Sequence, residues 1–302
     1  MAGKSKTVSH HAGRPPAAVE LVPEGVLAAA LPGKAEPAVF AFAALRPGSL
    51  VPGISESNVR APELVAEAIR VALGDVSPRT RSVTVVIPDT AVRVFVLDFD
   101  SLPDQADEMI SVLRFRLRKM VPFEVEHAGV SYQVLAQAQD ECRVLTAVMP
   151  GPILQEYETA ARAAGYEPGV VMPSSLAALA AIESQEPLLA ACLSGVSLTT
   201  LITHGEDLLL YRTLDLPEDP AQRLKEVQRD IAVAAAYYED KLAVRPRQLR
   251  YGGIGAAEDF ARWIRDPELE IVDLVSRPSR GATTAMGNLS VAGISGALAG
   301  AR

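Results

Sequence analysis

The order of its apolar runs constrains the fold of this 302-residue chain more than any other feature. Short apolar runs separated by Pro and Gly predict strands, and a continuous apolar run is typical of a strand buried on both faces. The first half reads AAVELV at 17–22, GVLAAAL at 25–31, AVFAFAAL at 38–45, a helical pattern at 61–74 and SVTVVI at 82–87. After Pro187 the plan repeats, with a strand meander that includes 192–212, a helix at 219–242, a strand at 248–253 and a further helix. The sequence therefore predicts an α/β protein with two related halves.

Residues 91–149 follow a different pattern. VRVFVLDFDSLP at 92–103 predicts a strand with alternating faces that leads into a helix, with Ser101 as its cap and Pro103 in its first turn. The helix ends at Pro122, and two further strands follow, of which CRVLTAVM at 142–149 is the second. We expect a small α+β subdomain inserted between the two parts of the first half.

Composition excludes several classes of protein. A net charge of −8 argues against a nucleic-acid binder, which needs a basic face. No apolar stretch reaches the roughly 18–20 residues of a membrane span, and the polar N-terminal segment has no apolar core of a secretory signal. We expect residues 1–16 to be a flexible polar lead-in and the protein to be cytoplasmic. The four histidines have no metal-ligand spacing to a Cys or an acid, and neither a Gly-x-Ser-x-Gly elbow nor a complete P-loop occurs.

Several stretches resemble PilM, the cytoplasmic actin-like protein of type IV pilus machines, within the FtsA/PilM group. The most specific are the helix start Leu102-Pro103, the helix end MVPF at 120–123 and the strand YQVL at 132–135. EVQRDIAVAAAYY at 226–238 is similar to the family's helix before the adenosine turn, and LRYGGIGA at 249–256 to the turn itself. The likeness covers roughly residues 17 to 300 and is strongest in the inserted segment.

The resemblance implies an actin-like (ribonuclease H-like) two-lobed α/β fold with an inserted α+β subdomain. We assign residues 17–90 and 150–185 to the first lobe, 91–149 to the inserted subdomain and 186–302 to the second lobe. The final helix is expected to return to the first lobe.

The resemblance also implies a nucleotide site, which this sequence lacks in part. The family's first phosphate loop, Asp-Ile-Gly-Ser-Ser, matches HHAGRPPAAVEL, where the acid is missing and Pro15-Pro16 removes two backbone donors. The second Asp-Ile-Gly matches Leu193-Ser194-Gly195, and no Asp in the chain stands two residues before a Gly. Mg²⁺ with a nucleoside triphosphate needs such oxygens. We therefore expect no ATP hydrolysis, no catalytic residue, no metal site and no bound cofactor. If ATP and Mg²⁺ do bind, the candidate residues are Gly195, Ser197, Gly252, Gly253 and Gly255.

The expected role is that of a non-catalytic scaffold. The resemblance implies that its partner is the cytoplasmic tail of a PilN-type inner-membrane protein, with other platform proteins nearby, so the chain would be peripheral at the inner membrane through its partners. An extended peptide could pair with a strand edge beside the inserted subdomain while its side chains fill apolar pockets. Candidate groove residues are Val94, Phe95, Leu97, Phe99, Leu102, Leu113, Leu117 and Phe123, each of which would also suit an ordinary core.

Three alternatives stay open at this point. The chain could be an ATP-binding regulatory switch of the same machine, in which nucleotide held by unconventional loops controls partner affinity. It could be an enzyme of the actin-like kinase group, which would need a catalytic acid and a metal site. It could also be the cytoplasmic actin-like domain of a type II secretion system, which shares the fold.

Overall fold

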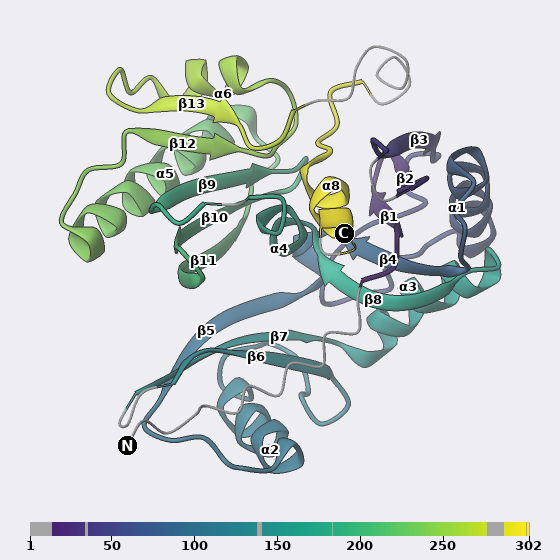
Figure 1. Ribbon diagram of the computed structural model, residues 1–302, viewed down its shortest axis with the longest axis horizontal. Coiled ribbons are helices and arrows are strands. Elements are labelled where there is room, and N and C mark those ends of the chain that lie inside the picture. Colours follow the sequence, from purple (N-terminus) through teal and green to yellow (C-terminus); the bar gives the residue numbers. More distant parts are fainter. Residues whose placement is uncertain are drawn as a thin grey trace.

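The first apolar meander forms one end of a mixed sheet. The computed structural model describes residues 14–33, 36–137, 141–182, 184–276, 287–299 and 301. Strands β1 (Ala17–Val22), β2 (Gly25–Ala30) and β3 (Val39–Ala44) are antiparallel, while β4 (Ser82–Ile87) and β8 (Glu167–Pro173) add in parallel. The order is β3-β2-β1-β4-β8 (Figure 1). Helices α1 (Pro62–Val76) and α3 (Gly151–Ala163) bury their apolar stripes against one face of this sheet.

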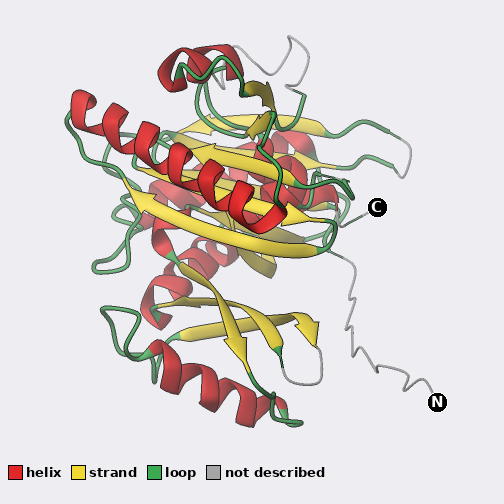
Figure 2. Cartoon of the chain, turned by 90° about the vertical axis from the view of Figure 1, so that its left-hand side faces the viewer, coloured by secondary structure: helices red, strands yellow, loops and turns green. Residues whose placement is uncertain are grey.

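The second meander builds a sheet with the same plan. Strands β9 (Leu188–Leu193), β10 (Ser197–His204) and β11 (Asp207–Asp215) are antiparallel, and β12 (Gln248–Tyr251) and β13 (Glu270–Asp273) add in parallel. The order, β11-β10-β9-β12-β13, repeats that of the first sheet. Helix α5 (Pro220–Leu242), which runs along this sheet in Figure 2, and α6 (Ala257–Ile264) cover one face. The two related halves predicted from the sequence are therefore present as two lobes.

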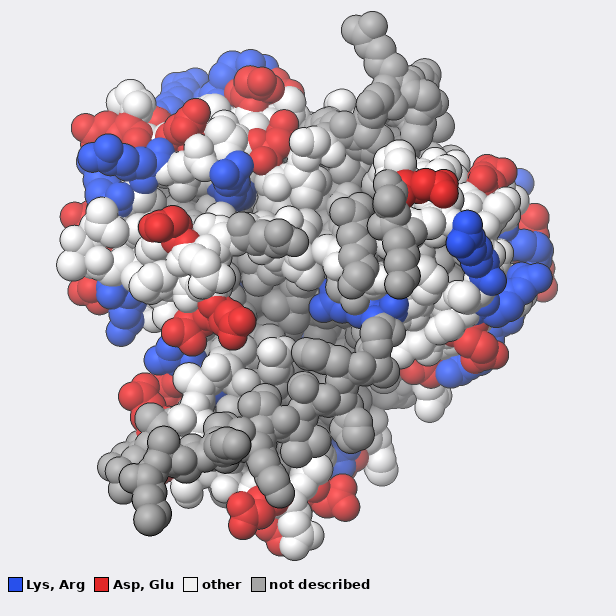
Figure 3. All heavy atoms as spheres, viewed as in Figure 1, with Lys and Arg blue, Asp and Glu red and all other residues white. Residues whose placement is uncertain are grey.

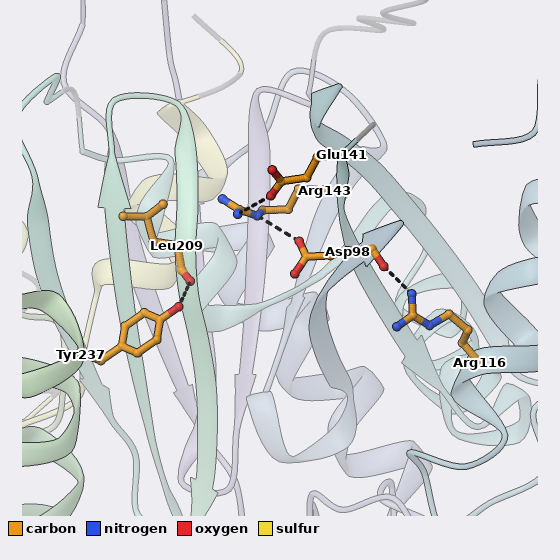
Figure 4. Close-up of polar contacts among 6 residues, drawn as sticks. All are labelled: Asp98, Arg116, Glu141, Arg143, Leu209 and Tyr237. Atoms are coloured by element: carbon orange, nitrogen blue, oxygen red, sulfur yellow. Dashed lines mark hydrogen bonds and ion pairs between the residues drawn. The ribbon is translucent and has the colours of Figure 1, made fainter. Parts of the chain in front are cut away.

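The inserted segment forms a third sheet with the order β5-β7-β6. Its strands are β5 (Arg93–Phe99), β6 (Gly129–Gln137) and β7 (Cys142–Met149), and a short 3-10 turn, η1 (Asp89–Ala91), joins β4 to β5. Helix α2 (Ala106–Leu117) lies below this sheet in Figure 1 and packs on it. Arg143 pairs with Asp98 and Glu141, and Arg116 donates to the Asp98 carbonyl oxygen (Figure 4). The same view shows Tyr237 of α5 donating to the Leu209 carbonyl oxygen of β11.

Two helices at the junction of the lobes come from distant parts of the chain. Helix α4 (Ser174–Leu179) follows β8 directly, and α8 (Ala292–Ala299) packs against α4, β1 and β2. The approach of α8 to α4 is close, because a Cβ on Gly296 would overlap the carbonyl oxygen of Ala177. The last described helix therefore lies against strands of the first sheet, between the two lobes (Figure 1).

Some helix boundaries differ from the sequence predictions. Helix α2 begins at Ala106 after an extended Gln105, so Ser101 does not cap it and Pro103 precedes it. Helix α1 continues past Gly74 to Val76, and the left-handed conformation of Ser77 (φ 48°) closes it in place of a glycine. Of the predicted polar lead-in, residues 1–13 lie outside the described part of the chain. The final helix is expected from the sequence over 283–300. Residues 283–286 lie outside the described part, and 287–291 are not helical, so the described helix begins at Ala292.

Candidate functional site

Segments from both lobes line one cavity between them. The matching strand orders make β1 the counterpart of β9, and β4 the counterpart of β12. The turn after β1 (residues 22–24) and the turn after β9 (residues 194–196) both line the cavity, together with the segments after β4 and β12 around Asp89 and Gly252. The carboxyl ends of central strands are where α/β sheets usually bind ligands. This cavity is therefore the place to look for a nucleotide site.

The segment predicted to be the first phosphate loop lies at the wrong end of β1. Pro15-Pro16 precedes β1 and lies at its amino end, where the Pro16 carbonyl oxygen accepts a hydrogen bond from the Leu31 N–H at 2.9 Å. The cavity is lined by the other end of the strand. Glu24 in that turn faces the second loop, since its Oε1 lies 3.6 Å from where a Cβ on Gly195 would stand. The two prolines therefore remove no N–H donor from the cavity.

Glu20 is an acid of the cleft that lies outside any Asp-x-Gly motif. Its side chain is 3% exposed, and both carboxylate oxygens have donors from the protein. Ser174 Oγ donates to Oε1 at 2.6 Å, and the backbone N–H of Ile294 donates to Oε2 at 2.9 Å. Ile294 lies in the first turn of α8, where a negative charge is favoured. Burial nevertheless raises the pKa of Glu20 to about 7, against the effect of these two hydrogen bonds.

Asp89 is the second acid of the cleft, and it links the lobes. Its Oδ1 accepts hydrogen bonds from the backbone N–H of Ser175 at 3.1 Å and from Ser175 Oγ at 2.9 Å. Its Oδ2 accepts from Thr199 Oγ1 of β10, in the second lobe, at 3.0 Å. Tyr211 of β11 extends the network, with its hydroxyl 2.6 Å from Ser175 Oγ. Burial raises the pKa of Asp89, and the bonds from Ser175 and Thr199 oppose that rise.

The loop predicted to be the second phosphate loop, residues 194–197, is closed on itself. Ser194 Oγ accepts hydrogen bonds from the backbone N–H groups of Val196 and Ser197, at 3.2 and 3.0 Å, and lies 2.9 Å from Ser197 Oγ. Ser197 is 2% exposed. Two N–H groups that a phosphate site would use as donors are therefore bound to a neighbouring side chain. Gly195, between Ser194 and Val196, lines the cavity.

The Gly-Gly-x-Gly turn packs against the segment that precedes α8. The Gly255 N–H donates to the Asn288 carbonyl oxygen at 2.8 Å, and Ser290 Oγ donates to the Gly252 carbonyl oxygen at 2.6 Å. A Cβ on Gly252 would stand 3.1 Å from the Cβ of Ala292, and one on Gly253 would overlap the ring of Tyr251. These close contacts, together with the positive φ (81°) of Gly255, give each glycine a packing reason that involves no ligand.

As it stands, this cleft does not fit a nucleoside triphosphate with Mg²⁺. Its cavity holds about 70 Å³, whereas small-molecule sites usually measure roughly 300–1,000 Å³. The oxygens of Glu20 and Asp89, the acids best placed to organise an ion, are bound to protein donors. In the described part of the chain, no group of three or more His, Cys, Asp or Glu side chains is arranged to hold a metal ion.

Of the eight predicted groove residues, seven lie on the side of the inserted sheet that packs on α2 and one lies on the opposite side. Leu97, Leu113 and Leu117 are buried in the core of the inserted subdomain, and Phe95, Phe99, Leu102 and Phe123 are half-buried where they pack on that core. Val94 points to the opposite face of the sheet, toward α4 and the second lobe. The structure therefore brings seven of the eight together around α2, and four of these keep exposed surface. The guanidinium of Arg116 lies over the ring of Phe99, 4.6 Å from its centroid.

A hollow that sequence reasoning missed lies between α1 and α3. It measures about 610 Å³ and is lined mainly by apolar atoms, with Val59, Pro62, Ala66, Pro152 and Ala160 among its residues. Glu156, which also lines the hollow, accepts hydrogen bonds from the N–H groups of Asn58 and Val59 at 2.7 and 2.9 Å and so holds the segment before α1 against α3. The pairing of α1 with α3 joins segments about ninety residues apart, and no local sequence signal marks it.

The architecture defines a class of protein. Two lobes with matching five-stranded sheets, a cleft lined by paired loops and a helix that crosses between the lobes make up the actin-like fold. No protein-family model matches the chain, and no curated protein matches it by sequence. The assignment to the actin-like fold rests on comparison with solved structures.

The chain is similar to a chain of the PilM-PilN type IV pilus biogenesis complex, with a TM-score of 0.72 and 19% identity over 95% of this chain and 98% of that one. It is also similar to the cytoplasmic domain of EpsL, an inner-membrane component of the type II secretion system of Vibrio cholerae. There the TM-score is 0.50 with 15% identity over 87% and 89% of the two chains. A protein from Bacteroides thetaiotaomicron with an actin-like ATPase fold and unknown function gives a TM-score of 0.50 and 11% identity over 85% and 90%. These likenesses confirm the predicted actin-like fold and the resemblance to PilM at the level of the fold.

Among the described residues, no helix combines the length and the apolar character that a membrane span requires.

Proposed function

We propose that the chain is a non-catalytic cytoplasmic scaffold of a type IV pilus inner-membrane platform, which binds the cytoplasmic tail of a PilN-type membrane protein. The observation that carries the proposal is the similarity to a chain of the PilM-PilN complex. The uncovered 5% of this chain is far smaller than the inserted subdomain, so the matched structure extends into that subdomain as well. The protein would be peripheral at the inner membrane through this partner.

The closed cleft supports a role without ATP turnover. Hydrolysis requires Mg²⁺ and ordered phosphate oxygens, and here Ser174, Ser175, Thr199 and the N-terminus of α8 occupy the carboxylates that would serve the ion. Binding of nucleotide would require these contacts to break and the lobes to separate. An ATP-binding switch remains the alternative within the same machine, and a calorimetric titration with Mg·ATP separates the two. We expect no heat of binding at physiological ATP concentration and no release of phosphate, whereas micromolar affinity would favour the switch.

A protein partner suits the surface better than nucleic acid does. Acidic and basic side chains are interspersed on the face shown in Figure 3, and no broad basic area appears among its described residues. The half-buried Phe95, Phe99, Leu102 and Phe123 offer apolar contact beside α2, and Phe115 and Met120 near the end of that helix are 69% and 43% exposed. An extended or helical tail with apolar anchors would bury these side chains.

The experiment is a binding titration with a peptide from the cytoplasmic tail of a co-encoded single-span membrane protein. We expect micromolar or better affinity. Phe99→Asp should abolish binding, because the apolar contact is lost and a tail that covers position 99 would have to bury a hydrated carboxylate beside Arg116. The variant should keep a cooperative melting transition, since Phe99 is half-buried at the end of β5. Val244→Asp, at a 50% exposed position just after α5, is the matched control and should bind normally. Normal binding by a folded Phe99→Asp protein would refute the docking surface around α2.

The similarity to the EpsL cytoplasmic domain favours a second candidate, the corresponding component of a type II secretion system. The two candidates differ in the membrane protein that supplies the tail. Parallel titrations with tails from pilus and secretion components encoded in the same genome decide between them. Tighter binding of the secretion-system tail would overturn the pilus assignment.

A further inference from the structure

Strand β3 leaves one edge of the first sheet open. It is the terminal strand in the order β3-β2-β1-β4-β8, and within the described residues no strand pairs with its outer side (Figure 1). An unpaired edge presents a row of N–H and C=O groups that can accept another strand. All six residues, VFAFAA, are apolar.

The other sheet edges carry features that discourage pairing. Strand β8 contains Pro168 and Pro173, and β13 begins and ends with the acids Glu270 and Asp273. Strands β5 and β11 contact each other, and β6 carries an irregularity between Val134 and Ala136. Charges, prolines and bulges are the devices by which proteins protect an edge. Among the described edge strands, β3 is the one that has none of them within its length.

We propose that β3 is a homodimerisation edge, which pairs antiparallel with β3 of a second copy about a two-fold axis at Ala41. The backbone polarity permits this register. The Leu45 N–H donates to the Glu24 carbonyl oxygen, in the turn before β2. In the register of β2 with β3, the backbone N–H and C=O groups of Leu45, Ala43, Ala41 and Val39 therefore point toward β2. Phe40, Phe42 and Ala44 therefore point their backbone groups outward. A two-fold at Ala41 places Phe40 opposite Phe42 of the second copy, which makes both residues members of hydrogen-bonded pairs.

Side-chain chemistry selects a second copy as the occupant. Two Phe40–Phe42 pairs would form across the new strand pair, and aromatic cross-strand pairs stabilise sheets. The exposed Glu36 and Arg46 stand five residues before and five residues after Ala41. In an antiparallel pair the start of one strand meets the end of the other, so Glu36 of each copy approaches Arg46 of its partner. The edge is thus self-complementary in both shape and charge.

Helix α1 extends the apolar surface beside this edge. It packs against β2 and β3, and Leu64 and Val71, two turns apart on it, are 39% and 45% exposed. A two-fold perpendicular to the sheet would put both α1 helices on the same face of a continuous ten-stranded sheet. Val39, the first residue of β3, is 43% exposed.

Sedimentation equilibrium of the full chain over a concentration series tests the proposal. We expect a reversible dimer. Glu36→Arg and Arg46→Glu should each weaken it by about tenfold, because two symmetric attractions become repulsions. The double variant Glu36→Arg/Arg46→Glu should regain the wild-type constant. Asp240→Arg, an exposed change of the same charge on α5, should leave the constant unchanged.

A backbone test complements the charge test. Ala44→Pro removes an outward N–H from an exposed position, so the monomer should fold and the dimer should weaken. In hydrogen exchange the amides of Phe40, Phe42 and Ala44 should slow as concentration rises. A chain that stays monomeric, a dimer that tolerates both single reversals, or a dimer with unprotected β3 amides would overturn the proposal. Each of these results leaves the tail-binding function untouched, because that function is measured with a different ligand and on a different subdomain.

Discussion

Glu20 and Asp89 are buried carboxylates, and each depends on donors that are remote in the sequence. Glu20 is held by groups 154 and 274 positions away, and Asp89 by groups 86 and 110 positions away. The sequence carries a hint of both, because Glu20 interrupts AAVELV and Asp89 directly follows the buried run SVTVVI. Their surroundings could not be predicted, since Ile294 of α8 reaches Glu20, and Ser175 and Thr199 reach Asp89, only through the tertiary fold.

The pKa of Glu20 leads to a test by pH. The folded-state pKa is about 7, above the ordinary 4.5, so the folded chain binds more protons than the unfolded chain between these values. Stability attributable to this carboxyl is therefore highest below about pH 4.5 and falls as the pH rises to about 7. Glu20→Gln, which is neutral throughout, should gain up to about 3 kcal/mol relative to the wild type between pH 5 and pH 8.

Denaturant unfolding of both proteins at the two pH values measures this difference. Any loss of hydrogen bonding in the glutamine variant is independent of pH and cancels between the two conditions. Parallel pH profiles for wild type and variant would contradict the assignment of a raised pKa to Glu20.

At the scale of elements, periodicity and punctuation predicted the strands and the long helices. Helix α5 was expected over 219–242 and spans Pro220–Leu242, with the Asp219 carboxylate accepting from the Gln222 N–H. The predictions failed where tertiary contacts decide. The start of α2 was placed at Ser101 on local capping signals, yet residues 101–105 are not helical. The phosphate loops were predicted from short motifs. The loops that line the cleft are instead identified by the matching strand orders of the two sheets.

The contact of α4 with α8 gives a prediction about glycine. Gly296→Ala should destabilise the protein by at least about 2 kcal/mol, because the new methyl group would overlap the backbone of Ala177 and force the helices apart. Gly74→Ala is the matched control. A Cβ there meets nothing within 4 Å, so the alanine should stabilise α1 by up to about 1 kcal/mol. Chemical denaturation measures both values, and equal effects would show that α4 and α8 are packed less closely than described.

For the whole molecule, the network around Asp89 joins the lobes where a nucleotide would otherwise lie. Asp89→Ala leaves the N–H of Ser175 and one bond of Thr199 without an acceptor. We expect a loss of about 1–3 kcal/mol of unfolding free energy, and faster hydrogen exchange in β10. Asp89→Asn keeps an acceptor for Ser175, and its amide can donate to Thr199, so its loss should be smaller. Equal losses in the two variants would remove Asp89 as the link between lobes.

Helix α8 also determines when this protein can finish folding during its synthesis. Ala18, Leu27 and Ala29 of the first sheet are buried against Ile294 and Leu298, at the other end of the sequence (Figure 1). A ribosome that adds about 5–20 residues per second needs roughly ten to fifty seconds to travel from β3 to α8. During that interval the lobe that emerges first shows an uncovered apolar face. A nascent chain of this kind is a natural client for ribosome-associated chaperones, and the lobe that is made first is completed last.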